Sequence, residues 1–174
     1  TSQPPYAFGS GGWRPLTFAQ EGKTHMSLID VLLFDRFERK PTSLWEAIKE
    51  TLTMPKALKQ QKALYNQMCL TCEDGVDADE MPNAIGEFGM TPSNPIPCKT
   101  ILGSRAYLSR LRTTDGFSIA YTRSGSFGSD VTPHPVDCYQ ISHPNGEHLA
   151  TLYISPYQKR VSRKAPLGFQ LHHM

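Results

Sequence analysis

The first part of the chain has the hydrophobic spacing of helices. Val31 and Leu32 lie three and four positions after Leu28, which predicts a first helix. Farther along, Pro55 separates two more segments with apolar residues at helical spacing, since a proline ends one helix and is well placed to open the next. We therefore predict a helical segment over residues 26–92.

Both segments beside Pro55 carry further helix signals. Ser43 and Glu46 form the Ser-x-x-Glu pattern of a capping box, which marks a helix N-terminus. The hydrophobic residues behind this cap recur at helical spacing: Trp45, Ile48 and Leu52. After Pro55, one helical face is formed by Ala57, Leu58, Gln61, Leu64, Tyr65 and Met68. Two consecutive helices are therefore predicted here.

The period of the pattern changes in the second half. A short helix is predicted from Ile101 to Arg112, and its inward residues are Ile101, Leu102, Tyr107, Leu108 and Leu111. Apolar and polar residues then alternate, which predicts strands near residues 117–122, 136–141, 148–157 and 168–171. A glycine-serine turn over residues 123–130 and an Asn-Gly hairpin turn separate the first three. We predict an α+β protein: an N-terminal helical segment, then a helix and a three- to four-stranded antiparallel sheet.

A proline-rich stretch, Glu87–Lys99, joins the two parts. Asn94 and Ile96 each precede a proline and so favour extended backbone, which predicts a semi-rigid strap packed on the fold. Residues 1–25 are rich in Gly, Pro and Ser, which fits either an irregular native arm or a tag-like segment. The predicted organisation is this arm, the helical segment, and an α+β segment over residues 93–174, with the two structured segments packed as one compact unit.

The net charge of +2 is unevenly distributed. Residues 1–92 contain 9 Lys/Arg and 12 Asp/Glu, whereas residues 93–174 contain 9 and 4. The densest basic patch of the second part is one short loop, with Lys159, Arg160, Arg163 and Lys164. Because such a patch attracts anionic surfaces, we predict that these four residues contact a partner.

The four cysteines allow two functional interpretations beside ordinary reduced thiols. Cys69 and Cys72 form a CxxC pair, which Cys98 and Cys138 would complete as a zinc site. A second CxxC, usual in zinc ribbons, is missing. A redox pair needs its first cysteine at a helix N-terminus, whereas this pair closes a predicted helix. Reduced thiols are the favoured interpretation, and no cofactor is expected.

Candidate catalytic residues lie in the predicted strands and the loops beside them: Tyr121, Arg123, His134 and His143. A metal-independent ribonuclease needs a base, an acid and a cation for the phosphorane charge, and these residue types supply them. A helix followed by a four-stranded antiparallel sheet with His, Arg and Tyr on its face is similar to the barnase-like ribonuclease and bacterial toxin architecture. The resemblance covers about residues 99–171 and lies at the level of the fold.

Motifs of hydrolases, zinc proteases and dinucleotide enzymes are missing from the sequence. The chain also has no apolar run of the roughly 18 residues that a membrane span needs, and its first residues do not resemble a signal peptide. We therefore expect a small cytoplasmic, non-catalytic interaction or regulatory protein that binds a macromolecular partner, most directly another protein. The alternatives are a toxin-like ribonuclease and an RNA-binding module that uses the basic C-terminal sheet face.

Overall fold

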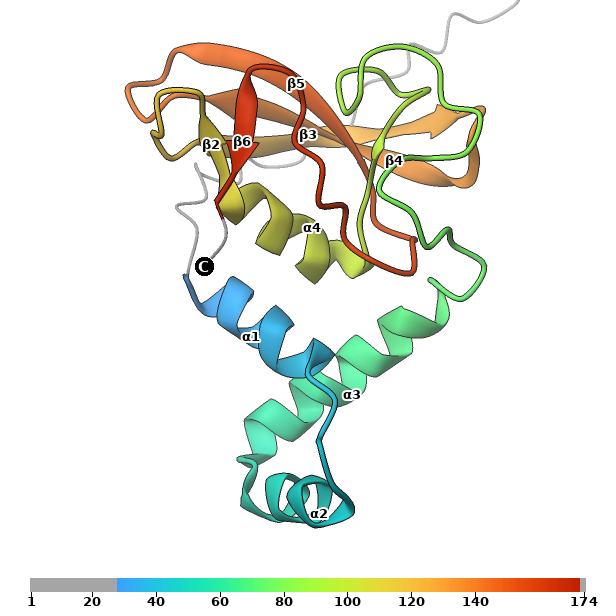
Figure 1. Cartoon of the computed structure of the whole chain (residues 1–174), viewed down its shortest axis with the longest axis vertical. Coiled ribbons are helices and arrows are strands. Elements are labelled where there is room, and N and C mark those ends of the chain that lie inside the picture. Colours follow the sequence, from blue (N-terminus) through green and yellow to red (C-terminus); the bar gives the residue numbers. More distant parts are fainter. Residues whose placement is uncertain (1–27, 173–174) are drawn as a thin grey trace, which may run out of the picture.

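A computed structural model gives the structure of residues 28–172, so the arm predicted over residues 1–25 lies outside the described residues. Three helices form a projection below the rest of the molecule (Figure 1). They are α1 (Leu28–Glu38), α2 (Leu44–Thr53) and α3 (Lys56–Leu70). All three follow the predicted pattern, with Pro55 as the N-cap of α3 rather than its first residue.

The main sheet lies at the opposite end from α2. Its meander of antiparallel strands consists of β3 (Ala120–Ser129), β4 (Thr132–Ser142) and β5 (His148–Ser155). A short strand from the strap, β1 (Ile96–Pro97), pairs parallel with β5, which gives the order β1-β5-β4-β3. The fold is therefore α+β, but the sheet is mixed rather than purely antiparallel.

The predicted last strand joins a different sheet. β6 (Phe169–Leu171) pairs with β2 (Leu111–Thr113), not with the meander. The preceding helix, α4 (Thr100–Arg110), ends two residues earlier than predicted because Leu111 turns to extended backbone and pairs with Leu171. Ile101, predicted inward, is exposed.

The predicted glycine-serine turn is wrong, since residues 123–129 continue β3. Serine side chains fasten this strand to β4: Ser124 Oγ donates to the Cys138 carbonyl at 3.2 Å, and Ser126 Oγ donates to Asp137 at 2.9 Å. Register shifts near Gly125 mark bulges, which glycine accommodates and which are common in edge strands. The actual turn lies at the end of the predicted segment, between Ser129, the last residue of β3, and Thr132, the first residue of β4.

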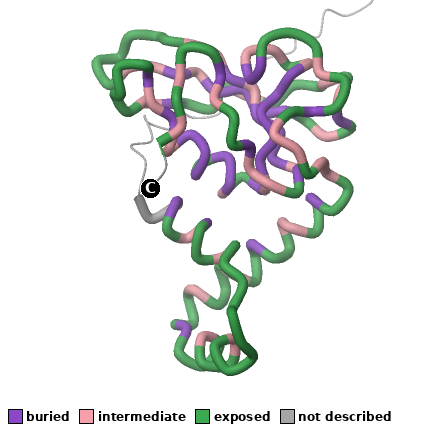
Figure 2. The backbone as a smooth tube through the Cα atoms, in the orientation of Figure 1, coloured by how far each residue is buried: buried purple, intermediate pink, exposed green. Residues whose placement is uncertain are grey.

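Helix α4 is the centre of the molecule, with the sheet on one side and α1 and α3 on the other (Figures 1 and 2). Tyr107 and Leu108 of α4 belong to the main core. The other buried members of this core come from the strap, the strands and the end of α4: Phe88, Ile96, Cys98, Leu111, Tyr121, Tyr139, Ile141, Leu152 and Ile154. Ala106 of α4 packs with Phe34 and Tyr65 in a second, smaller cluster. The helical projection is therefore anchored on the α+β part through α4.

Glu38 adds a polar fastening to this anchor. Its Oε1 accepts hydrogen bonds from the Tyr65 hydroxyl at 2.5 Å and from Lys99 Nζ at 2.8 Å, so it joins α1, α3 and the start of α4. Burial raises the pKa of Tyr65, and the bond to Glu38 raises it further, so the phenol remains a donor. Both apolar and charged contacts therefore hold the helical projection against the α+β part of the molecule.

The strap packs on the fold as predicted. Asn94, Pro95, Ile96, Pro97 and Cys98 are all buried, and the Cys98 N–H donates to the Ser155 carbonyl at 2.9 Å. The strap therefore serves as an edge of the main sheet. Across residues 28–172, no helix combines the length and apolar composition that a membrane crossing requires.

Candidate interaction surface

The start of α2 is held by a modified capping box. The N-cap hydroxyl of Ser43 accepts a hydrogen bond from the Glu46 N–H at 3.2 Å, as the sequence predicts. In return, Glu46 Oε2 accepts from the backbone N–H of Thr42 at 2.8 Å, one residue before the usual partner, and from the Thr42 hydroxyl. These bonds, chiefly the one from the hydroxyl, lower the pKa of Glu46.

Helix α2 turns its charged side toward its neighbours. Glu50 lies 3.9 Å from Arg36 of α1 and 3.9 Å from Lys62 of α3. The opposite side of α2 carries its large apolar residues, and their exposed fractions are high: Leu44 79%, Trp45 73%, Ile48 43% and Leu52 75%. We call these four residues the α2 stripe.

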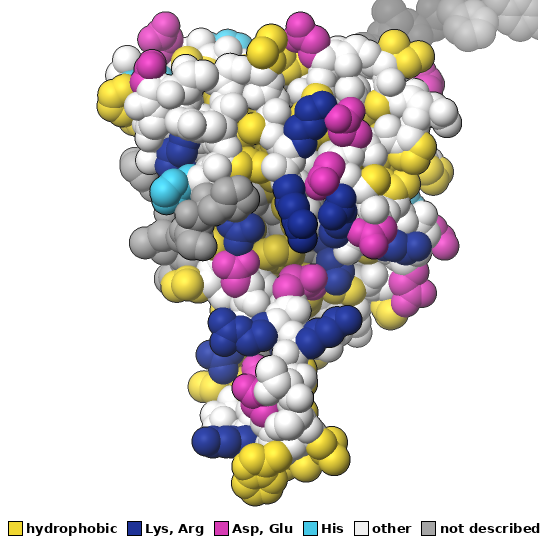
Figure 3. Space-filling view, in the orientation of Figure 1, with side chains coloured by type: hydrophobic (Ala, Val, Ile, Leu, Met, Phe, Trp, Pro, Cys, Tyr) yellow, Lys and Arg dark blue, Asp and Glu magenta, His cyan; other side chains and the backbone are white. Residues whose placement is uncertain are grey.

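The orientation of α2 is the reverse of an ordinary surface helix, which buries its apolar stripe against the body. No residue of α2 is buried. Hydrophobic side chains gather at the lower end of the projection, where α2 lies (Figure 3). A contiguous exposed apolar patch at the tip of a projecting element is the usual mark of an interaction site, since single exposed leucines are common but grouped ones are not.

The surface around the stripe is positive. Residues 39–62 contain six Lys/Arg and two Glu, and both glutamates are engaged, Glu46 in the cap and Glu50 between α1 and α3. Within residues 28–172, no ion pair is formed by the exposed lysines of this region: Lys40, Lys49, Lys56 and Lys59. Dark-blue cationic side chains accordingly line the projection above its apolar tip (Figure 3).

The basic loop predicted to bind a partner faces an acidic loop of the same chain. Arg160 lies 3.3 Å from Asp77 and 2.9 Å from Asp79, and Lys164 pairs with Glu80. We call these ion pairs the loop clamp. An anionic partner at this loop would compete with these carboxylates, so partner binding here stays a prediction and has less free charge to support it than the surface around α2. The other two predicted contacts are Lys159 and Arg163. Lys159 is exposed, and the backbone N–H of Arg163 donates a hydrogen bond to Asp79 Oδ1 at 2.8 Å.

The four candidate catalytic residues do not form one site. His134 lies near the start of β4 and His143 just beyond its end, so nine residues of extended chain, about 30 Å, separate them. His134 stacks on Tyr157 with ring centroids 4.6 Å apart. Arg123 pairs with the buried Asp137 at 2.7 Å, which chiefly accounts for the raised pKa of Arg123. A general acid and a general base that act in one reaction must both lie within hydrogen-bond distance of the same substrate, and these two histidines are too far apart for that.

Tyr121 belongs to the core rather than to a surface site. Its ring packs edge-on against Tyr139, with centroids 5.8 Å apart, and both residues are buried. The predicted catalytic set thus divides into a core tyrosine, an ion-paired arginine and two distant histidines. The ribonuclease hypothesis gains no geometric support from this arrangement.

The cysteines are not gathered for metal binding. All four thiols are free, and among residues 28–172 no three His, Cys, Asp or Glu side chains are grouped so that they could hold a metal ion. Burial raises the pKa of Cys98 and of Cys69. Cys69 lies in the last turn of α3, where the helix dipole also disfavours a thiolate.

Comparison of the chain with protein-family models, with curated proteins and with solved structures finds no match. The exposure of the α2 stripe could not be predicted from the sequence, because an apolar period of 3.6 residues identifies a helix face without showing what covers it.

Proposed function

We propose that this protein is a non-catalytic interaction or regulatory protein that binds another protein through the α2 stripe. The observation that carries the proposal is the reversed orientation of α2, with Glu50 facing α1 and α3 and four large apolar side chains facing solvent. A partner that covered the stripe would remove this apolar surface from water, which stabilises the complex by about 25 cal/mol per Å² before association costs.

The charge around the stripe supports an acidic partner. Lys49 flanks the stripe on α2 itself, and Lys40 and Lys56 follow at the two ends of the helix. An apolar groove with an acidic rim complements this surface in both shape and sign. A second copy of the chain suits it less well, because a twofold contact through α2 would place the same positive surface against itself.

Affinity capture from a lysate, with the stripe changed and unchanged, tests the proposal. Leu52→Ser removes one apolar contact at a position that is 75% exposed, and Ile85→Ser makes a similar change at a position that is 76% exposed and distant in sequence. We expect Leu52→Ser to weaken capture of an acidic protein by roughly tenfold, which corresponds to the loss of about 1.4 kcal/mol of interface contact, while Ile85→Ser captures it like the unchanged chain.

Three results would count against a protein partner. Equal capture by both variants would remove the stripe from the interaction. A blue shift of Trp45 fluorescence with anionic vesicles, in a Trp13→Phe background, would assign the stripe to a membrane surface instead. Capture of RNA that is lost steeply with salt and unaffected by Leu52→Ser would favour nucleic-acid binding by the lysines.

A further inference from the structure

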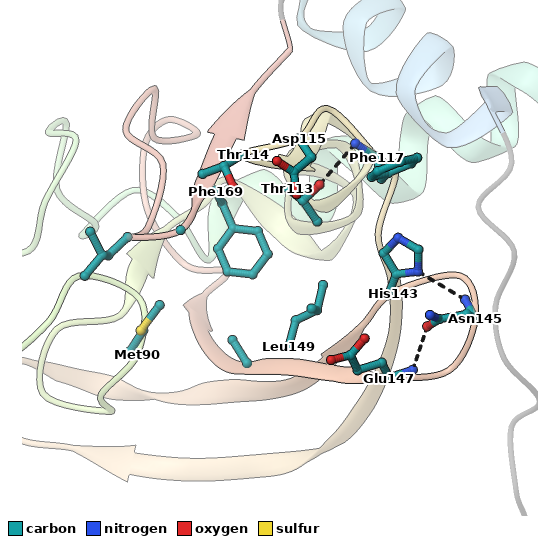
Figure 4. Close-up of a pocket in the computed structure, with 13 residues that line it drawn as sticks. Met90, Thr113, Thr114, Asp115, Phe117, His143, Asn145, Glu147, Leu149 and Phe169 are labelled. Atoms are coloured by element: carbon teal, nitrogen blue, oxygen red, sulfur yellow. Dashed lines mark hydrogen bonds between the residues drawn. The ribbon is translucent and has the colours of Figure 1, made fainter.

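A second surface feature lies on the far side of the molecule from α2. A groove of about 410 Å³ opens between the loop that follows β2, the β4–β5 hairpin and the segment before β6 (Figure 4). This volume falls within the range of small-molecule sites in proteins. The groove involves none of the residues of the α2 stripe or of the loop clamp.

Apolar side chains form the inner part of the groove. Leu149 lies between Phe169 and the hairpin residues, and Met90 closes the end beyond Phe169 (Figure 4). Phe117, which is 56% exposed, stands at the other end with its ring against His143, at a centroid distance of 5.2 Å. The groove therefore offers aromatic and aliphatic contacts to a compact apolar body.

The charged groups of the groove are all acidic. Asp115 and Glu147 line it from two different loops, and none of its described lining residues is Lys or Arg. Both carboxylates are exposed, and within residues 28–172 neither makes an ion pair or a side-chain hydrogen bond. Asn145 bonds to the backbone of Glu147 rather than to its carboxylate, since Asn145 Oδ1 accepts the Glu147 N–H at 2.9 Å.

Both loops that carry the carboxylates are held in shape by their own hydrogen bonds. Thr113 Oγ1 accepts the Phe117 N–H at 3.1 Å, and the Gly116 N–H donates to the Thr113 carbonyl at 2.9 Å. In the hairpin, the His143 N–H donates to the Glu147 carbonyl at 2.8 Å. The groove is therefore preformed, which lowers the entropic cost of binding.

We propose that this groove binds a small organic amine with an aromatic or aliphatic body. Its ammonium group is attracted by Asp115 and Glu147, which lie on two walls of the groove, and its apolar body packs on Leu149 and Phe169. The carboxylates attract the cation, the aromatic ring adds a cation–π contact, and the apolar floor selects for a hydrophobic body over a hydrated inorganic cation. This site is independent of the partner surface on α2.

Methyl NMR spectra of the whole chain test this proposal, with 2-phenylethylamine as the probe and 2-phenylethanol as its neutral counterpart. We expect the amine to shift the methyl signals of Leu149, Leu167 and Met90 saturably, and the alcohol to bind at least about fivefold more weakly. Asp115→Asn with Glu147→Gln weakens amine binding about fivefold to tenfold and leaves the alcohol unchanged, since two exposed charge contacts are lost.

The matched control is Glu87→Gln with Asp130→Asn, which removes the same charge from positions that do not line the groove. This control should bind the amine like the unchanged chain. Equal binding of amine and alcohol, equal loss in both double variants, or methyl shifts that do not saturate would each overturn the proposal. Thermal melting of the groove variant, expected to match that of the control, shows that the fold is intact.

Discussion

Glu46 shows how one side chain controls the presentation of the stripe. Its carboxylate holds the first turn of α2 through the two bonds from Thr42, and these bonds lower its pKa below the ordinary value of 4.5. A lowered folded-state pKa means that the cap contributes fully above about pH 4.5, the unfolded value, and is lost as the pH falls through the folded value. The start of α2 should therefore loosen in acid.

Amide hydrogen exchange in the first turn of α2 measures this loosening. We expect the protection of Ala47 and its neighbours to fall as the pH drops below about 4.5 in the unchanged chain. In Glu46→Gln, whose side chain does not titrate, protection should vary little over the same range. Parallel loss in both chains would show that the cap is not the titrating element.

Gly75 is required by close backbone packing rather than by a special turn. A Cβ at this position would lie 2.2 Å from the Tyr157 carbonyl oxygen and 2.6 Å from the Gln158 Cα, and backbone atoms cannot move aside locally. Gly75→Ala should lower the free energy of unfolding by about 2 kcal/mol. Gly128→Ala, where nothing lies within 4 Å, is the control, and denaturant titration should find it within about 0.5 kcal/mol of the unchanged chain.

At the scale of elements, helix positions followed from the sequence, but the exposure of α2 did not. The Ser43 cap and the 3.6-residue period define α2 by local interactions. Its orientation places Glu50 beside Arg36 and Lys62, which belong to other helices and are far from Glu50 in the local sequence pattern. One local signal was present: both glutamates of α2 lie on the side of the helix opposite the apolar residues, and one of them, Glu50, lies beside cations of α1 and α3.

The strand that replaced the glycine-serine turn was missed for a related reason. Local propensity in Arg123–Asp130 favours a turn, whereas pairing with β4 supplies the hydrogen bonds that stabilise β3. Likewise, the pairing of β1 with β5 joins residues far apart in sequence, which no local pattern reveals. The groove at Asp115 and Glu147 was invisible for the same reason, because its walls come from separate loops.

The reversed orientation of α2 makes opposite predictions for two apolar residues of the projection. Leu52→Ser should change the free energy of unfolding by no more than about 0.5 kcal/mol, because Leu52 is exposed in the free chain. Phe34→Ala should lower it by about 3 kcal/mol, because Phe34 is 6% exposed and packs with Tyr65 and Ala106. Denaturant titration of both variants checks this, and a large loss in Leu52→Ser would show that the stripe is covered within the chain.

At the scale of the whole molecule, charge is used in two ways. The loop clamp pairs an acidic segment of the first half with the basic loop of the second half, which offsets much of the charge imbalance seen in the sequence. Among residues 28–172, the exposed lysines Lys40, Lys49, Lys56 and Lys59 around α2 form no ion pair, and only Lys62 meets a carboxylate there, that of Glu50. Free positive charge is therefore concentrated beside the apolar stripe.

The clamp should contribute modest, salt-sensitive stability. Arg160→Gln with Lys164→Gln should lower the free energy of unfolding by roughly 1 kcal/mol at low salt, and the difference should shrink in about 1 M salt because surface ion pairs are screened. Lys159→Gln with Arg163→Gln, which leaves those ion pairs intact, is the matched control. A loss that does not depend on salt would contradict an electrostatic clamp.

Photo-crosslinking from α2 identifies the molecule that covers the α2 stripe. A photoreactive amino acid placed at Ile48, within the stripe, is compared with one at Ile85, which is also exposed but outside it. We expect one acidic protein to be crosslinked from Ile48 and not from Ile85, and the product to diminish when Leu52 is changed to Ser. Crosslinking from Ile48 to lipid, to RNA or to a second copy of the chain, or the same products from both positions, would contradict this expectation.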